Sequence, residues 1–504
     1  MAERYQHTLI TNFSGGVQRS VSRLLMAEDE SSIIENGELP KIGSIFKVKG
    51  SSFKGADVNT DYDILGAIGG YKPSTGTLKL IAVADGASNS DAYTFNPITN
   101  VWTPHNLSLT TGAKAEFAQF LDGFFMVNFS DTTRWNNFTQ WYTTTNVTTA
   151  PKARYIAIFL SRVYLFYVNY DGSTYSSRCV YSDLPTGSPM TVAWDNSLNY
   201  FDIDTDDGDV GMGLGVNGNR LLLFKEKSLF RYDTNSLYKV PGCPGTVSQR
   251  TVKNIQGLTL YLHSTGLWGY DGASGQLLSR NIDEVIKGVS ASSLAGACAV
   301  VKGDHYYVFV GDVSNSQANL EISNCLIDYD AAKNACTWRS LHRAPTIFFD
   351  YKTDTSSITY DAATVSYSSA EITYNALLDA QDKTYFGTKE GQVLEWGGSN
   401  YDGQYPISFL VETRDLYFSY PVLFKLFQKV IVLHNRGAGL TIQYKVDDGN
   451  WLTLGRVDQN NSELIFPYGT RGRRIKFRLF ESSSTDTFEL EGLDVHYTLE
   501  GTTE

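Results

Sequence analysis

Apolar and polar side chains alternate through residues 257–272, GLTLYLHSTGLWGYDG. Leu258, Leu260 and Leu262 occupy every second position, a short polar stretch beginning at Ser264 interrupts the pattern, and apolar residues resume at Leu267. Alternation with a period of two, broken by a polar turn, is typical of a β-hairpin. Because a single hairpin cannot bury its own apolar face, the pattern predicts that further units of the same kind cover it.

A related pattern occurs earlier in the chain. Residues 223–233, LFKEKSLFRYD, align with residues 261–271, YLHSTGLWGYD, 38 positions later. Looser copies begin at Ile81, Met126, Val163, Tyr306 and Tyr385, which gives about seven units between roughly residues 55 and 400. Recurrence near 40 residues, with several strands in each unit, is typical of a β-propeller. We therefore expect an all-β fold with a propeller of about six to eight blades, and a tandem of β-sandwiches is the alternative.

Several units end alike, with an aromatic residue and Asp or Asn, a short turn, and a strand that carries Trp. Trp102, Trp141 and Trp338 take that place. We expect them to pack between blades, and a stacking platform for sugars or bases is the functional alternative.

The regions on either side of the repeat differ from it. Residues 1–50 form a mixed segment in which we expect a short helix near Ser20–Met26, and residues 51–400 form the propeller. Residues 401–504 contain short alternating stretches separated by Asp- and Gly-rich turns, so we expect an antiparallel C-terminal β-sandwich there.

Composition adds three expectations. The net charge of −12 argues against nucleic acid wrapping tightly around the surface, although it allows a surface past which nucleic acid slides. The five cysteines are scattered, which favours reduced, buried thiols. No apolar run is long enough to span a membrane, and the polar stretch MAERYQHTLITNF does not resemble a signal peptide.

The acidic stretch 201–211, FDIDTDDGDVG, is the best metal candidate in the sequence. Asp202, Asp204 and Asp206 begin like a calcium-binding loop, but Asp207 stands where an EF-hand requires Gly and Gly213 where it requires Glu. An exposed turn is the alternative that we favour. The seven histidines form no HExxH motif, and no phosphate loop or GxSxG turn is present, so we predict no catalytic residues, no cofactor and no enzymatic activity.

A basic stripe follows near the C-terminus. It consists of Arg471, Arg473, Arg474, Lys476 and Arg478. The last three alternate with apolar residues, which places the charges on one face of a strand and a core on the other. This face is either simply solvated or in contact with a protein or nucleic-acid partner.

The order of elements resembles the nozzle proteins of tailed bacteriophages, the group that includes tail tubular and packaged-DNA stabilisation proteins. The resemblance is carried by residues 181–189, YSDLPTGSP, by the stretch from Asp202 to Asp233, and by residues 242–272 followed by LLSRNIDEVI. The sandwich then begins with FLVETRDLYFSYPVLFKLFQKVIVL.

The resemblance implies a structural virion protein that assembles as a ring, usually of six copies, below the portal and adaptor. Such a ring forms a channel that retains double-stranded DNA without sequence specificity and releases it on infection, next to tail fibre or spike proteins. Asp206, Asp207 and the basic stripe are then the candidates for channel or partner contacts. A receptor- or carbohydrate-binding propeller of the virion is the alternative function, and a polysaccharide hydrolase is a third.

Overall fold

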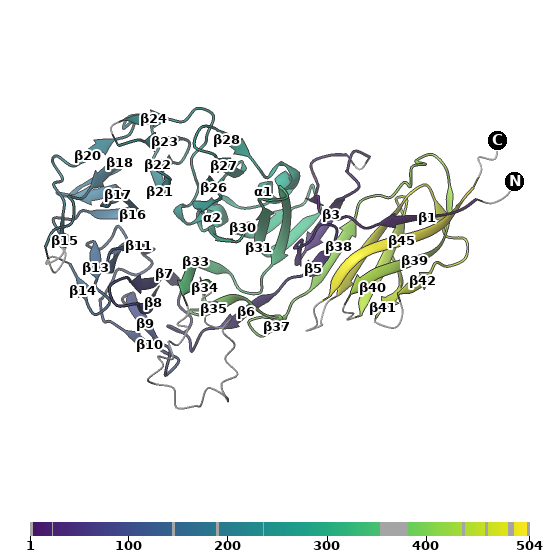
Figure 1. The fold of residues 1–504 in the computed structure, drawn as a ribbon, viewed down its shortest axis with the longest axis horizontal. Helices are drawn as coiled ribbons and strands as arrows, with labels where there is room; N and C mark the ends of the chain where they lie inside the picture. The colour runs from purple at the N-terminus through teal and green to yellow at the C-terminus, as the bar shows by residue number, and fades with distance from the viewer. Residues whose placement is uncertain are drawn as a thin grey trace, which may run out of the picture.

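The computed structural model shows a β-propeller joined to a β-sandwich, with both chain ends at the far end of the sandwich (Figure 1). It describes residues 4–500 except 23, 144–146, 188–190, 235, 353–381, 436–438, 459–461 and 482–487. The predicted all-β fold with a propeller and a C-terminal sandwich is therefore confirmed.

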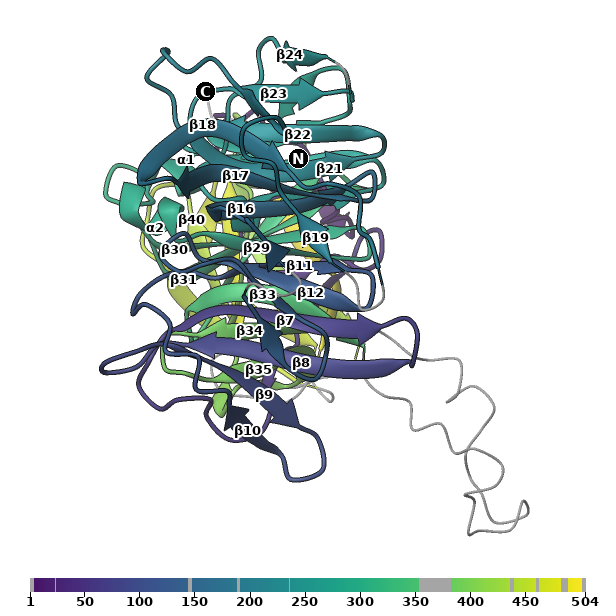
Figure 2. The same cartoon turned by 90° about the vertical axis from the view of Figure 1, so that its left-hand side faces the viewer.

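Five blades of the propeller are separate antiparallel four-stranded sheets. In chain order they are β7 (Ile64–Lys72), β8 (Thr77–Ala84), β9 (Asp91–Asn96) and β10 (Val101–Pro104); β11 (Glu116–Phe120), β12 (Gly123–Val127), β13 (Arg134–Asn136) and β14 (Trp141–Tyr142); β16 (Lys152–Phe159), β17 (Arg162–Tyr170), β18 (Ser173–Tyr181) and β20 (Tyr200–Asp202); β21 (Gly211–Asn217), β22 (Arg220–Lys225), β23 (Leu229–Tyr232) and β24 (Leu237–Lys239); and β25 (Lys253–Ile255), β26 (Leu258–His263), β27 (Gly266–Tyr270) and β28 (Gly275–Leu277). The first strand of each blade lies toward the axis, and Figure 2 shows β7 to β10 side by side in order.

Two further four-strand units complete the ring as parts of larger sheets, so the blades fall within the predicted range. One unit is β29 (Cys298–Lys302), β30 (His305–Asn315), β31 (Leu320–Asp330) and β32 (Ala335–Ser340). The other is β33 (Pro345–Lys352), β34 (Asp382–Thr388) and β35 (Val393–Ser399), with β6 (Gly50–Phe53) as its fourth strand. Because β6 precedes the first blade and pairs with β35 of the last one, backbone hydrogen bonds close the ring.

The repeat in the sequence corresponds to equivalent hairpins of successive blades. Residues 223–233 span β22 and β23, and residues 261–271 span β26 and β27, the second and third strands of their blades. Trp102, Trp141 and Trp338 all lie on fourth strands. Trp102 and Trp338 are buried, and half-buried Trp141 packs edge-on against Phe124. Trp102 and Trp141 pack with residues of a neighbouring blade, as predicted, and Trp338 belongs to the core that the propeller shares with the sandwich; none of the three forms an exposed platform.

The sandwich has two antiparallel layers that enclose apolar residues such as Val430, Ile442 and Phe477. One layer consists of β1 (Arg4–Ile10), β4 (Gly37–Glu38), β5 (Ile45–Lys47), β39 (Lys425–Asn435), β42 (Glu463–Ile465), β43 (Arg471–Gly472) and β45 (Glu489–Leu499); the other contains β3 (Glu30–Glu35), β38 (Phe409–Thr413), β40 (Leu440–Val446), β41 (Leu452–Val457) and β44 (Ile475–Glu481). Strands from residues 1–50 thus pair with strands from residues 401–504, a connection that the predicted division of the chain did not contain.

The remaining elements are small. They are β2 (Gly16–Val17), β15 (Val147–Thr148), β19 (Val192–Ala193), β36 (Tyr401–Asp402), β37 (Tyr405–Pro406), α1 (Asp283–Lys287), α2 (Ala291–Ala295) and the 3-10 turns η1 (Gln249–Thr251) and η2 (Arg280–Ile282). The helix expected near Ser20–Met26 is wrong for the described residues, which form bends and turns: the Ser20 N–H donates to the Gln18 side chain, and the Leu25 N–H donates to the Ser22 carbonyl in a single turn that is not continued. No helix in the described part of the chain has the length and apolar character to cross a membrane.

All five cysteines are buried free thiols, as expected.

A continuous sheet fixes the sandwich to the propeller. β3 pairs with β38 of the sandwich and, through Glu35 and Trp338, with β32 of a blade. Asn36 strengthens this junction: its backbone N–H donates to the Trp338 carbonyl at 2.9 Å and its side chain donates to Ser340 Oγ at 3.1 Å. The two parts therefore share a hydrogen-bonded layer instead of a linker.

We predict that Trp338→Ala lowers the free energy of unfolding by about 3–5 kcal/mol, because the ring is 1% exposed at this junction and its removal leaves a cavity. The measurement is chemical denaturation followed by fluorescence and circular dichroism. Ile98→Ala, at a position 93% exposed, is the control and should change the value by less than about 0.5 kcal/mol. Equal effects of the two substitutions would contradict the assigned junction.

Candidate functional site

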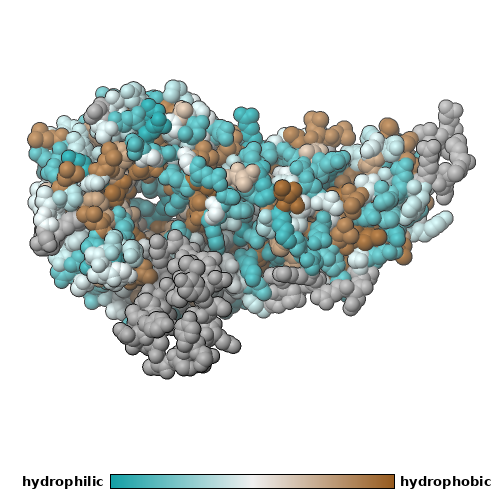
Figure 3. All heavy atoms as spheres, viewed as in Figure 1, coloured by the Kyte–Doolittle hydropathy of each residue, from teal (hydrophilic) through white to brown (hydrophobic). Residues whose placement is uncertain are grey.

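Three cavities lie around the propeller axis, where the inner strands of the blades approach one another. Their volumes are about 410, 290 and 420 Å³. The first is lined by residues of β7, β11, β25, β29 and β33, and Arg250 on η1 lines all three. The space-filling view is hollowed near the centre of the propeller (Figure 3). Arg250 therefore borders all three axial spaces.

Other blades hold Arg250 in place. Its Nε donates to Glu116 Oε1 at 2.8 Å, and its two NH₂ groups donate to the carbonyls of Thr346 at 2.8 Å, Leu65 at 2.5 Å and Ala115 at 3.1 Å. These acceptors come from three neighbouring parts of the ring, and the arginine side chain is 6% exposed. The planar guanidinium suits such a role because its donors point in fixed directions. Arg250 thus cross-links the blades at the axis.

Further charges surround this link. The pKa of Lys114 is lowered because the propeller removes water from the ammonium group and because positive Arg250 lies nearby. Desolvation likewise lowers the pKa of Lys253, against the opposing attraction of Asp350 and Glu116. Burial raises the pKa of the Cys298 thiol to about 12, so this thiol stays protonated at neutral pH. The axis therefore gathers cationic and acidic side chains in surroundings that weaken the hold of Lys114 and Lys253 on their protons.

The axial spaces have the size of small-molecule pockets. The major groove of DNA alone is about 12 Å wide, so a duplex requires a far wider passage than cavities of about 410 Å³ crossed by the Arg250 hydrogen bonds. A double helix therefore cannot thread through the axis of this propeller.

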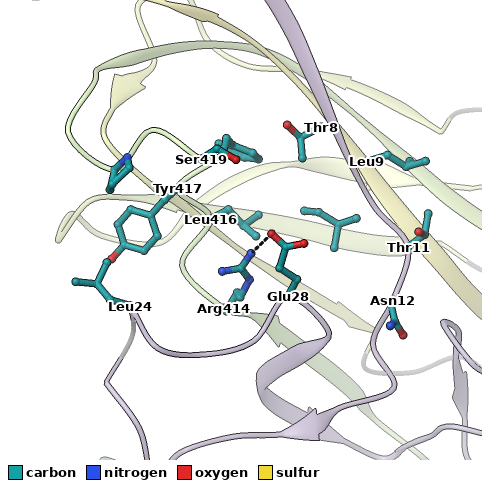
Figure 4. A pocket seen from close by; sticks show the side chains of 13 residues that line it. Thr8, Leu9, Thr11, Asn12, Leu24, Glu28, Arg414, Leu416, Tyr417 and Ser419 are labelled. Carbon is teal, nitrogen blue, oxygen red and sulfur yellow. Dashed lines mark ion pairs between the residues drawn. The ribbon is translucent and has the colours of Figure 1, made fainter.

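A second candidate site lies at the sandwich, where β1 and the loop at residues 414–421 border a groove of about 410 Å³ (Figure 4). Leu9, Leu416 and Phe418 supply apolar walls, and Arg414 pairs with Glu28 across the opening at 3.5 Å. Residues Thr8–Ile10 of β1, an edge strand, form one wall of the groove. Apolar side chains beside an open strand edge are typical of protein contact surfaces.

The sandwich carries exposed apolar residues on two opposite edges. Across one layer the order is β1, β45, β39 and β42, so β1 and β42 form its two sides. Leu9 on β1 is 53% exposed and Ile465 on β42 is 73% exposed. More than half of the exposed large apolar residues in the described part of the chain lie in residues 1–50 and 401–504, less than a third of its length. For its length, the sandwich part of the chain therefore exposes more large apolar side chains than the propeller does.

The predicted acidic stretch forms a turn between β20 and β21. Among the described residues its carboxylates do not converge on one point: Asp202 accepts two hydrogen bonds from Arg178, at 2.6 Å each, and Asp206 is exposed. The structure thus does not bring together Asp202, Asp204 and Asp206, the weak calcium candidates, because the turn spreads them over different partners.

Asp207 and Asp204 in this turn have structural contacts. The fully buried Lys225 ammonium donates to Asp207 Oδ1 at 2.6 Å and to the Asp204 carbonyl at 2.9 Å. Although desolvation opposes it, the hydrogen bond from Lys225 lowers the pKa of Asp207. The carboxylate therefore compensates a buried cation. A role of Asp206 and Asp207 beside a DNA channel stays a prediction.

The predicted basic stripe is found on β43, β44 and the residues between them, and its charges have partners within the chain. Ile475, Phe477 and Leu479 are buried, as the alternation predicted. Lys476 and Arg478 both pair with Glu412, at 2.9 and 2.5 Å. The other partners are Asp448 for Arg474, Glu500 for Arg471, and the ring of Phe424 beneath Arg473. This pairing reduces the positive charge that the face can offer to phosphate groups, and the predicted partner contact stays a prediction.

Sequence reasoning missed the axial charges. Arg250, Lys114 and Lys253 belong to no local motif, and they meet because the ring brings residues from different blades to one axis. The sequence around Arg250 gave no signal of this role. Such a position becomes informative only when the blade boundaries are known.

Comparisons with known proteins leave the family open. No family model matches the sequence, and no curated protein matches it. Among solved structures, the chain is similar to the extracellular domain of a putative one-component system from B. thetaiotaomicron, with a TM-score of 0.42 and 9% identity. The match covers 89% of this chain but spans only 60% of that structure.

We predict that Arg250→Met lowers the free energy of unfolding by about 3–5 kcal/mol, because Glu116 and three carbonyls then lose a buried cationic partner. Chemical denaturation provides the measurement. Adding Glu116→Leu to this variant should restore part of the loss. Arg231→Met, which removes the more exposed pair with Asp233, is the matched control and should cost less than about 1 kcal/mol. A similar small loss for Arg250→Met would show that the axial network is not a cross-link.

Proposed function

We propose that this protein is a ring-forming structural subunit of a bacteriophage tail nozzle, located in the virion, which surrounds the path of packaged DNA. The sequence resemblance suggests the role, and the observation that carries it is the presence of two unlike apolar edges on one rigid sandwich. A closed ring of identical subunits needs contacts in which one surface meets a different surface of the next copy. Edges β1 and β42 supply such a pair.

In this proposal the DNA passes along the axis of the ring, outside each propeller. The closed propeller axis supports this arrangement, because Arg250 and its partners occupy that space. The net charge of −12 and the paired basic stripe favour a surface that retains few phosphate contacts. Since each neutralised phosphate adds salt-dependent affinity, such a surface lets DNA move past.

We predict that Leu9→Glu prevents ring formation while the chain stays folded, because it places a charge on an exposed apolar edge. Sedimentation velocity over a range of concentrations measures the assembly state. Ile465→Glu on β42 should act in the same way, since it changes the opposite side of the proposed contact. Ile98→Glu, at an exposed turn of the propeller, is the control and should assemble like the unmodified chain.

If both edge variants assemble like the unmodified protein, the proposed contact between β1 and β42 is wrong. The location in the particle is tested separately, by gold-labelled antibody against this chain viewed by electron microscopy. Label on the tail axis beneath the portal supports the nozzle. Label on peripheral fibres would overturn the nozzle and favour the receptor-binding alternative, and absence from particles would overturn both.

A further inference from the structure

A compact group of metal-ligating side chains lies on the outer face of the sandwich. Among the residues that the structure describes, His7, Asp494 and His496 place one ligand atom each within 4.8 Å of one another. His7 lies on β1, and the other two lie on β45. These strands come from opposite ends of the chain, so nothing in the local sequence indicated the group.

The pairing of the two strands produces this arrangement. His7 faces His496 directly across the antiparallel ladder, and Leu9 faces Asp494. Residues two apart on a strand share a face, so Asp494 and His496 lie on the same side of the sheet as His7. The intervening Val495 points into the core and is fully buried. The three polar side chains are thus held on the solvent side by a packed layer beneath them.

The distances within the group are close to those of a coordination sphere. His7 Nδ1 lies 3.1 Å from Asp494 Oδ1, and His496 Nε2 lies 3.2 Å from Asp494 Oδ2. Ligand atoms about 2.0–2.1 Å from a tetrahedral zinc ion are separated from one another by about 3.3 Å. Small rotations of these side chains therefore suffice to bring the three ligand atoms around one ion.

Neighbouring groups orient the ligands. The Tyr5 hydroxyl lies in hydrogen-bonding contact with Nδ1 of His496, which leaves Nε2 of that ring for a metal. Such a partner on the second ring nitrogen is usual for histidines that bind metals. Lys429 on β39 faces His496 across the ladder, and it pairs with Glu463 at 3.3 Å, so its charge is compensated.

We propose that His7, Asp494 and His496 bind one divalent transition-metal ion, with zinc as the best fit. Two imidazoles and one carboxylate are suitable ligands for this ion and leave a fourth position for water. The Asp494 and His496 side chains are 18% and 12% exposed, whereas that of His7 is 61% exposed. Two ligands are therefore preformed, and His7 closes the site from the strand edge. Bound metal ties the first strand of the chain to the last.

The test is calorimetric titration of the full chain, without an affinity tag, with ZnCl₂, together with visible absorption of the Co²⁺-loaded protein. We expect one Zn²⁺ per chain, no comparable binding of Mg²⁺, and a Co²⁺ spectrum typical of nitrogen and oxygen ligands. His7→Asn and Asp494→Asn should each weaken Zn²⁺ binding by about tenfold or more. His434→Asn, on the neighbouring strand β39 and outside the group, should bind like the unmodified chain.

Absence of saturable Zn²⁺ binding at neutral pH would overturn the proposal and leave the group as a hydrogen-bonded cluster only. Binding that persists in both His7→Asn and Asp494→Asn would also overturn it, because the ion would then occupy another place. Since His7 is exposed, its substitution should not affect folding, and unchanged circular dichroism verifies this. The proposal does not depend on ring formation, so Ile465→Glu, on β42 and away from the three ligands, should still bind one Zn²⁺.

Discussion

Closure of the ring is the constraint on which the rest of the structure depends. Every blade has two apolar faces, and each face needs a neighbour, so an open ring would leave two faces in water. The backbone pairing of β6 with β35 supplies the missing contact. The same N-terminal region continues from β3, β4 and β5 of the sandwich, so the strand that closes the propeller also determines where the sandwich stands. The short ladder between β6 and β35 thus affects both the closure of the propeller and the position of the sandwich.

Closure also explains the charges at the axis. The inner strands meet where side chains are crowded, and carbonyls at their ends need donors. Arg250 supplies several donors from a single position, and Glu116 compensates its charge. The cost of burying the guanidinium is offset only while all partners are in place. The Arg250 network therefore holds neighbouring blades together at the axis.

The sequence was most informative where the structure consists of strands with regularly alternating apolar and polar side chains. The hairpin at residues 257–272 and the basic stripe were predictable, because a period of two places side chains on known faces. The place of Trp338 on the last strand of its unit followed from the repeat. The axial cluster and the histidine group were not predictable, since each combines residues that are distant in the chain and meet only through the closure of the ring or the pairing of β1 with β45. The acidic stretch forms the exposed turn that we favoured, but its contact with Lys225 was not predictable, because this lysine lies on a strand of the next blade.

The pairing of the first strand with the last has a consequence for synthesis. Because Arg4 faces Leu499 across the ladder, β1 has no partner strand until nearly the whole chain has left the ribosome. The propeller, which needs nothing beyond β35, can close earlier, as domains generally fold in order of their synthesis. The edge formed by β1 is completed only when β45 has been synthesised. A chain that stops before β45 therefore contains every strand of the propeller but leaves β1 without its partner strand.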